Sequence, residues 1–163
     1  IVEETSQKKK INESALATKL YSQYYAEPKN QEEIDQNTLL DYAVDQGLDV
    51  TRTKTGLYYI IHKEGKGPLL QRAQPTRAHY RGYFVDGKEF DSSYKKGRPI
   101  NFKVGQMVPG WNEALLLMNV GTKAQLLIPS RLAYGAKGFP GYVPPHTPLI
   151  FDIEILPLTQ DLK

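Results

Sequence analysis

The 163-residue sequence contains no cysteine and only one tryptophan. Without cysteine the chain has no disulfide framework, no thiolate metal site and no thiol nucleophile. No apolar run approaches the roughly 20 residues that a helix needs to cross a bilayer, so we expect no transmembrane segment. A cysteine-free composition suits the cytosol and the periplasm equally, and it leaves the compartment open.

Several motifs that carry chemistry are also missing. No two histidines lie three to five residues apart, so none of His62, His79 and His146 has metal-ligand spacing. The Gly-Lys-Gly at 65–67 is too short for a P-loop, and no Gly-x-Ser-x-Gly motif occurs. The basic run at 8–10 favours a solvated helix start over a nucleic-acid site. We therefore expect no metal, no cofactor and no nucleic-acid partner.

What is present resembles an ordinary soluble globular protein in composition. Hydrophobic residues make up 40% and charged residues 24% of the chain, and the net charge is +3. This length accommodates one domain and an appendage. The sequence begins at Ile1 rather than Met, which indicates that a preceding segment was removed, and a lost signal sequence fits this.

Residues 1–50 are predicted to form a helical extension. Over about 11–26, Leu16, Leu20 and Tyr24 recur every four residues, the spacing of an amphipathic helix that Pro28 ends. A second helix is expected to follow this one. Together the two helices form a hairpin too small to bury a core alone, so it must pack on another surface.

The second helix is marked by sequence signals at both ends. Asn30 followed by Glu33 has the pattern of an N-cap with a reciprocal acid, and Gly47 supplies the stop. The helix is expected to end at about Gln46 and to bury three residues, Leu39, Tyr42 and Ala43.

Residues 51–163 are predicted to form a second domain of α+β class. Asp86 and Gly87 supply a hairpin turn, and a short helix begins at Pro109 and stops at Gly121, with Trp111 on its buried face. Alternating or β-branched runs predict an antiparallel sheet, with strands at 57–62, 76–85, from 90, 100–104, 122–128 and 149–156.

One loop, at 134–145, is unusually aromatic for a segment rich in Gly and Pro. Such a loop is typical of the wall of a small apolar pocket. Trp111 lies beside Pro-Gly at a helix start, and Tyr134 offers a hydroxyl at the loop entrance. The position of Asp91, directly before two serines, suits a residue that caps a turn as well as one that contacts a bound ligand. These residues alone predict an apolar pocket with one hydroxyl, and they do not decide whether the Asp91 carboxylate belongs to that pocket.

Five sequence blocks carry a further signal. They are YRG at 80–82, DGKEFDSS at 86–93, VPGW at 108–111, PSRLAYGAKG at 129–138 and PGYVPPHTPLIFDIEIL at 140–156. In order and spacing these blocks resemble the FKBP-type peptidyl-prolyl cis-trans isomerases, the macrolide-binding immunophilins, in a bacterial form with a short helical N-terminal extension. The resemblance covers roughly residues 55–158 and implies a half-barrel of antiparallel sheet wrapped around one short helix.

The resemblance also implies a set of site residues. Four are expected at the centre of the pocket: Tyr134 as donor to a substrate carbonyl, Asp91 as the carboxylate, Trp111 as the floor, and Phe151 as a wall. The expected substrate-binding residues are Tyr80, Phe90, Ile100, Met107, Val108, Phe139, Tyr142 and Val143.

Departures from the family pattern fall at the mouth of the pocket. Phe139 and Tyr142 stand where the family archetype has a histidine and an aliphatic residue, which implies an altered preference around the proline. The archetype pairs its aspartate with an arginine; here either Lys96 or Arg98 could serve Asp91.

The implied function is acceleration of X–Pro bond rotation in folding polypeptides, without a covalent step. The alternative is a proline-peptide-binding chaperone or interaction module whose catalysis is vestigial. Proline-containing polypeptides and macrolide inhibitors are the expected ligands. The extension implies either a homodimer or docking on its own domain, and either a periplasmic or envelope location or a cytoplasmic one.

Overall fold

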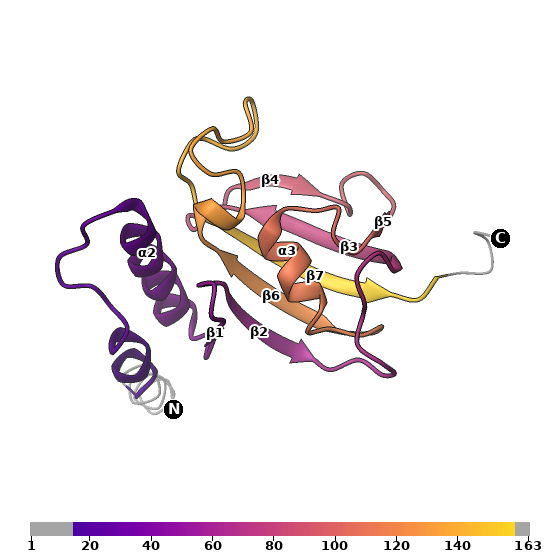
Figure 1. Cartoon of the computed structure of the whole chain (residues 1–163), viewed down its shortest axis with the longest axis horizontal. Helices are drawn as coiled ribbons and strands as arrows, with labels where there is room; N and C mark the ends of the chain where they lie inside the picture. The colour runs from indigo at the N-terminus through magenta and orange to yellow at the C-terminus, as the bar shows by residue number, and fades with distance from the viewer. Residues whose placement is uncertain (1–14, 159–163) are drawn as a thin grey trace, which may run out of the picture.

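The computed structural model describes residues 15–158. Its centre is a seven-stranded antiparallel sheet with the strand order β1-β2-β6-β7-β3-β4, in which β5 also pairs with β3 (Figure 1). The predicted α+β class, with an antiparallel sheet and one short helix behind an N-terminal helical segment, is confirmed. The strands are β1 Thr51–Arg52, β2 Tyr58–Lys63, β3 Pro75–Tyr83, β4 Glu89–Ser92, β5 Ile100–Lys103, β6 Lys123–Ile128 and β7 Leu149–Leu156.

The inner face of the sheet carries the main core, against helix α3, Pro109–Leu115. The helix packs closely, because a Cβ on Gly110 would lie 2.6 Å from Ile128 Cγ2. We predicted that this helix continues to Gly121, and that was wrong. Beyond Leu115 the backbone forms i→i−3 hydrogen bonds that tighten the chain into turns, although Met118 remains buried at 1% exposure.

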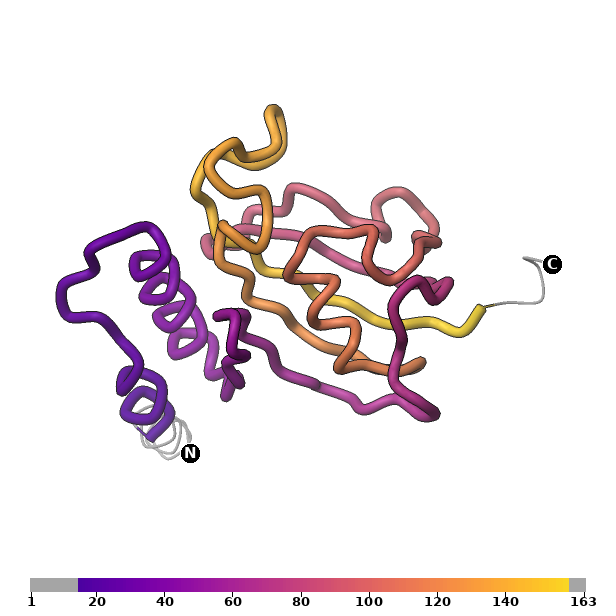
Figure 2. The backbone as a smooth tube through the Cα atoms, viewed as in Figure 1, coloured from indigo at the N-terminus to yellow at the C-terminus, as the bar shows by residue number. Residues whose placement is uncertain are grey.

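The outer face holds a second core under the helical extension. The side chains of Tyr58, Leu127, Ile150 and Tyr83 form one row across four strands, in register, at one end of the sheet. All four are buried against the helices, together with Leu20, which has no exposed surface. Figure 2 shows the extension lying beside this end of the sheet. The extension therefore docks on its own domain.

Helix α2, Gln31–Gln46, has the two ends that the sequence indicated. The Asn30 side chain accepts a hydrogen bond from the Glu33 amide at 2.9 Å, and Glu33 in return accepts from the Lys29 amide at 3.1 Å. Gly47 adopts φ 68°, a left-handed conformation that closes the helix. No helix among residues 15–158 has the length and apolarity needed to cross a bilayer.

The first helix ends earlier than we predicted. It runs over 15–21 and stops at Tyr21 rather than Ala26, while its predicted start near residue 11 lies outside the described residues. Tyr24 is therefore off the helical face and 42% exposed. The cause is Asn37 of α2, whose side-chain amide pairs with both the N–H and the C=O of Tyr25 at 2.8 Å. These bonds hold an extended connector in place of another helical turn.

Candidate active site

A cavity of about 360 Å³ opens between α3 and the inner face of β3, β4 and β7, a size typical of small-ligand pockets. Nine residues line it, and eight of them are among the twelve predicted from the sequence. The ninth, Gln106, was not predicted. The eight are Tyr80, Phe90, Asp91, Met107, Val108, Trp111, Tyr134 and Phe151.

Aromatic rings at near right angles build the floor and walls. Trp111 is 1% exposed and meets Phe151 edge-on, with ring centroids 5.4 Å apart and an interplanar angle of 89°. Tyr80 also meets Trp111 at 5.4 Å, and Phe90 meets Phe151 at 5.7 Å. Such edge-to-face pairs are favoured by the ring quadrupoles, so the pocket is shaped before any ligand enters.

Gly82 makes this arrangement of rings possible. A Cβ at this position would lie 2.7 Å from Phe90 Cζ and 2.8 Å from Phe151 Cε1, closer than carbon atoms approach. The two wall rings therefore occupy the space that any other residue would fill. Gly82 belongs to one of the five sequence blocks, but nothing in the sequence indicated this contact.

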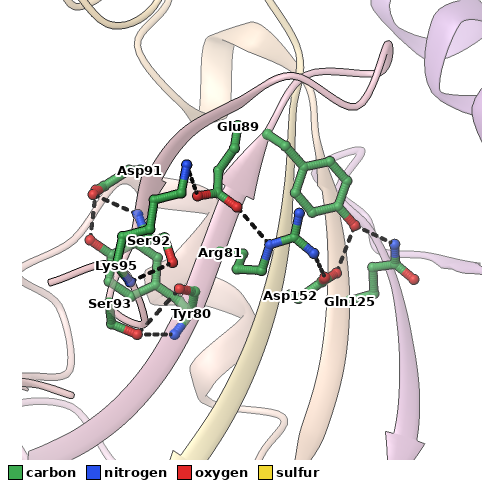
Figure 3. Close-up of polar contacts among 10 residues, drawn as sticks. Tyr80, Arg81, Glu89, Asp91, Ser92, Ser93, Lys95, Gln125 and Asp152 are labelled. Carbon is green, nitrogen blue, oxygen red and sulfur yellow. Dashed lines mark hydrogen bonds and ion pairs between the residues drawn. The ribbon is translucent and has the colours of Figure 1, made fainter. Parts of the chain in front are cut away.

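Asp91 lines the cavity and is held there by polar contacts, and Figure 3 shows Tyr80 and Ser92 beside it. Its carboxylate accepts hydrogen bonds from the Tyr80 hydroxyl at 2.6 Å and from the Ser92 amide at 2.9 Å. Lys96 Nζ lies 3.1 Å from the same carboxylate, whereas Arg98 forms no ion pair with any residue between 15 and 158. Lys96 is therefore the cation that forms the ion pair with Asp91. Burial, and next the hydrogen bond to Asp91, raise the pKa of Tyr80.

Two further polar side chains brace the site, and both were missed from the sequence. Ser93 is fully buried and accepts from the Tyr80 amide at 2.8 Å. Asn112 clamps the segment before α3, because its side-chain oxygen accepts from the Met107 amide at 2.9 Å while its nitrogen donates to the Met107 carbonyl at 2.8 Å. Asn side chains often bond nearby backbone groups, and an Asn close to a helix start is a signal that could have revealed the role of Asn112.

Two hydrogen-bond donors face the cavity without a protein acceptor. Burial, and next the charge of Asp91, raise the pKa of Tyr134, so its hydroxyl stays protonated at neutral pH. Within the described chain, that hydroxyl donates to no residue. The amide of Val108 at the N-terminus of α3 is likewise unpaired there, with the helix dipole behind it. Both donors are available to a ligand carbonyl.

The other four predicted site residues do not line this cavity. Ile100 lies on β5 opposite Ala78 and packs against the core, and Val143 is buried at 3% exposure. Phe139 and Tyr142 are 46% and 58% exposed at the tip of the loop at 134–145, which we call the site loop. Paired backbone bonds between residues 139 and 143 fold that tip into a tight turn, and neither ring is among the residues that line the cavity. Their role in substrate binding stays a prediction.

The helical extension also contacts the base of the site loop. Asp35 of α2 is 1% exposed, and its carboxylate accepts from the Ser130 amide at 2.8 Å and from the Ser130 hydroxyl. Ser130 opens the short 3₁₀ helix η1, Ser130–Leu132, and its carbonyl accepts from the Gly135 amide at 2.7 Å. A buried carboxylate of the extension thus anchors the turn from which Tyr134 projects.

Comparison with known proteins places this chain in a family. Residues 69–156 match the family described as FKBP-type peptidyl-prolyl cis-trans isomerase. The chain belongs to that family. The FKBP-type 22 kDa peptidyl-prolyl cis-trans isomerase of Escherichia coli strain K12 is 43% identical over 107 residues, which are 66% of this chain and 52% of that protein. FkpA of the same strain is 41% identical over 115 residues, 71% of this chain and 42% of FkpA.

Solved FKBP structures extend the similarity to the helical extension. The crystal structure of FkpA from Escherichia coli matches with a TM-score of 0.70 and 33% identity, over 96% of this chain and 70% of that one. A peptidyl-prolyl cis-trans isomerase from Pseudomonas syringae pv. tomato matches with a TM-score of 0.68 and 30% identity, over 83% of this chain and 98% of that one. The chain spans about half the length of the curated relatives it matches.

Proposed function

We propose that this FKBP-family chain is a peptidyl-prolyl cis-trans isomerase that binds the prolyl group of a polypeptide in the cavity over Trp111. The observation that carries the proposal is a preformed aromatic box with two unpaired donors, the Tyr134 hydroxyl and the Val108 amide, at its edge. The box accepts an apolar ring, and the donors reach the carbonyl groups beside it.

The reaction needs no bond to a side chain. Rotation about an amide faces a barrier of roughly 18–20 kcal/mol because resonance is lost as the bond twists. The carbonyl of the twisted amide is less polar than that of the planar amide. An apolar cavity that excludes water therefore disfavours the planar ground state more than the twisted transition state. The Tyr134 hydroxyl and the Val108 amide hold the flanking carbonyls in the twisted geometry.

Asp91 contributes through its fixed position. Its carboxylate is bound by Tyr80, Ser92 and Lys96, and these bonds orient the Tyr80 ring that forms one wall. The carboxylate also places a negative charge at the polar edge of an otherwise apolar cavity. We propose that Asp91 acts by positioning the Tyr80 ring, because a negative charge beside the amide nitrogen would oppose the electron density that this atom gains during the twist.

A second candidate function is a proline-peptide-binding chaperone with vestigial catalysis. It is favoured by exposed aromatic surface outside the cavity, at Phe139 and Tyr142 on the site loop and at Tyr21, Tyr24 and Tyr25 on the extension. Refolding of one protein limited by proline isomerisation and of another that lacks proline separates the two functions. An isomerase accelerates only the first, whereas a chaperone that merely suppresses aggregation raises the yield of both without changing the slow rate.

We also propose that a macrolide inhibitor occupies the same cavity, and that residues 1–50 and 51–163 form the extension and the isomerase domain. The similarity to FkpA across the extension supports an exported, envelope location and a homodimer formed through the N-terminal helices. Leu20 is already buried within its own chain, so the surface offered to a partner is the exposed Tyr21 and Ile34. Sedimentation of the wild type against Tyr21→Ser plus Ile34→Ser tests this, and an unchanged monomer in both excludes the dimer.

A further inference from the structure

A second groove, of about 670 Å³, lies next to the prolyl cavity and is not used by the mechanism above. It is bounded by the β3–β4 turn on one side and by residues 140–145 of the site loop on the other. Phe90 lines both the cavity and the groove, so the two share a wall. A chain that leaves the cavity past Phe90 enters the groove directly.

The groove has an aromatic lining that continues from the prolyl cavity. Phe84 stacks on Phe90 with centroids 5.1 Å apart. On the opposite side Tyr134, Phe139 and Tyr142 form a stacked series, with successive centroids 5.2 and 4.9 Å apart. The first ring of this series lines the cavity and the last lines the groove. Apolar side chains of a bound segment would therefore find contacts along the whole path.

The charge of the groove is positive. Lys88 and Lys137 line it, and neither ammonium group pairs with an acid in the part of the chain that the structure describes. Asp86, in the same turn as Lys88, uses its carboxylate to accept the Lys88 amide at 2.9 Å.

The one acid that lines the groove is already paired. Glu89 lies between Arg81 at 2.8 Å and Lys95 at 3.0 Å, and Figure 3 shows it held by both. Arg81 in turn lies 3.7 Å from Asp152, which joins Glu89 to a polar network on the outer face of the sheet. The lysines therefore remain as the charges available to a ligand.

We propose that this groove binds the substrate polypeptide beside the proline, and that it selects segments in which an acidic residue lies next to a large apolar one. The inference rests on the proposed isomerase function, because the groove is filled by the same chain that places its proline over Trp111. The aromatic rings take the apolar side chain, and Lys88 and Lys137 take the carboxylate. Because the cavity and the groove share Phe90, this segment lies close to the proline along the bound chain.

The test uses synthetic peptides of defined sequence with the full chain. A short chromogenic Ala-Leu-Pro-Phe peptide reports the prolyl cavity alone. Longer peptides add Glu-Phe, or Lys-Phe as the matched control, about three residues before or after the proline. We expect one Glu-Phe position to raise kcat/KM about fivefold over its Lys-Phe counterpart, the size of two partly exposed ion pairs. Salt at 0.5 M should reduce the gain, because exposed charges are screened.

Charge-reversal variants assign the gain to the groove. Lys88→Glu plus Lys137→Glu should abolish the preference for Glu-Phe while keeping the rate on the short peptide. The matched control is Lys63→Glu plus Lys66→Glu, which makes the same change at two exposed lysines. In the strand register Lys63 lies opposite Lys123, at the start of β6, whereas the site loop follows the end of that strand. Lys63 therefore lies at the opposite end of β6 from the loop that borders the groove.

The outcomes separate failure of the two proposals. No acceleration of the short peptide would overturn the isomerase function itself. Acceleration of the short peptide with equal rates for Glu-Phe and Lys-Phe at both positions would overturn the groove proposal alone. If both pairs of variants abolish the preference equally, the preference reflects overall charge. This outcome too would overturn the groove proposal. If the Lys88 and Lys137 variant instead changes the sedimentation of the protein, the groove holds a second copy of the chain rather than substrate.

Discussion

At the scale of single residues, Tyr134 is the polar group on which the proposed chemistry depends most directly. Removing its hydroxyl by Tyr134→Phe leaves the ring stacked on Phe139 and deletes one donor. A hydrogen bond of this kind contributes about 0.5–1.5 kcal/mol, so kcat/KM on a short X–Pro peptide should fall about two- to tenfold. Because burial raises the pKa of Tyr134, the wild-type rate should not vary between pH 6 and 9. A variant as active as the wild type would remove Tyr134 from the mechanism.

Gly82 offers a second test at the residue scale. The added methyl group in Gly82→Ala must displace Phe90 and Phe151, since it would lie under 3 Å from both rings. We expect overpacking to cost about 1–3 kcal/mol of stability and the distorted walls to raise KM. Urea unfolding and peptide kinetics measure the two effects. Loss of stability with an unchanged KM would show that the two rings are not part of the binding surface.

Sequence resemblance located most cavity residues because they lie in contiguous blocks with fixed spacing. It could not decide between Lys96 and Arg98 at Asp91, since that choice depends on the path of the turn after β4. Nor could it reveal that Ser93, in a different segment of the chain, accepts a hydrogen bond from the Tyr80 amide. Such bonds require two segments to be adjacent in space, which spacing along the chain does not specify.

At the scale of elements, the contact between α2 and η1 connects the extension to the site loop. Asp35→Ala leaves the Ser130 amide and hydroxyl without their acceptor in a buried position. Loss of the partner of a buried donor costs about 1–3 kcal/mol, and we expect thermal unfolding to occur at correspondingly lower temperature. The matched control, Asp45→Ala, changes an exposed acid on the same helix and should unfold like the wild type. Equal unfolding temperatures for the two variants would contradict the anchoring role.

Local sequence signals predicted some element boundaries and failed at others. Asn30, Glu33 and Gly47 act through neighbours within four residues, so the ends of α2 could be predicted. The end of the first helix could not, because Asn37 captures the backbone of Tyr25 twelve residues away. Periodicity alone continued the helix across a segment that tertiary hydrogen bonds hold extended.

At the scale of the whole molecule, the sheet carries apolar cores on both faces. Alternation along the strands predicted the antiparallel sheet, and in β3 the alternate residues Ala78, Tyr80 and Gly82 are buried. The second core had a signal that was not used: apolar residues also occupy outward positions at one end of four strands, at Tyr58 and Ile150 among others. Only the register of the sheet brings these positions into one row beneath α2.

Burial of tyrosines in this second core predicts sensitivity to alkali. Burial raises the pKa of Tyr58 to about 12, against an ordinary value of 10.0. The unfolded chain loses this proton from about pH 10, while the folded chain keeps it until about pH 12. The contribution of Tyr58 to stability is therefore complete below pH 10 and is lost as the pH rises to 12. Urea unfolding at pH 8 and pH 11 should show a smaller loss for Tyr58→Phe than for the wild type, and an equal loss would contradict this.

The central claim is that the cavity over Trp111 accelerates rotation of a prolyl bond. A protease-coupled assay on a short X–Pro peptide measures this directly, with the wild type, with a macrolide added, and with Trp111→Ala. We expect the wild type to accelerate isomerisation, the macrolide to abolish the acceleration, and Trp111→Ala to lose most of it through collapse of the pocket floor. A wild-type protein that is folded by circular dichroism, yet leaves the spontaneous rate unchanged, would contradict the account.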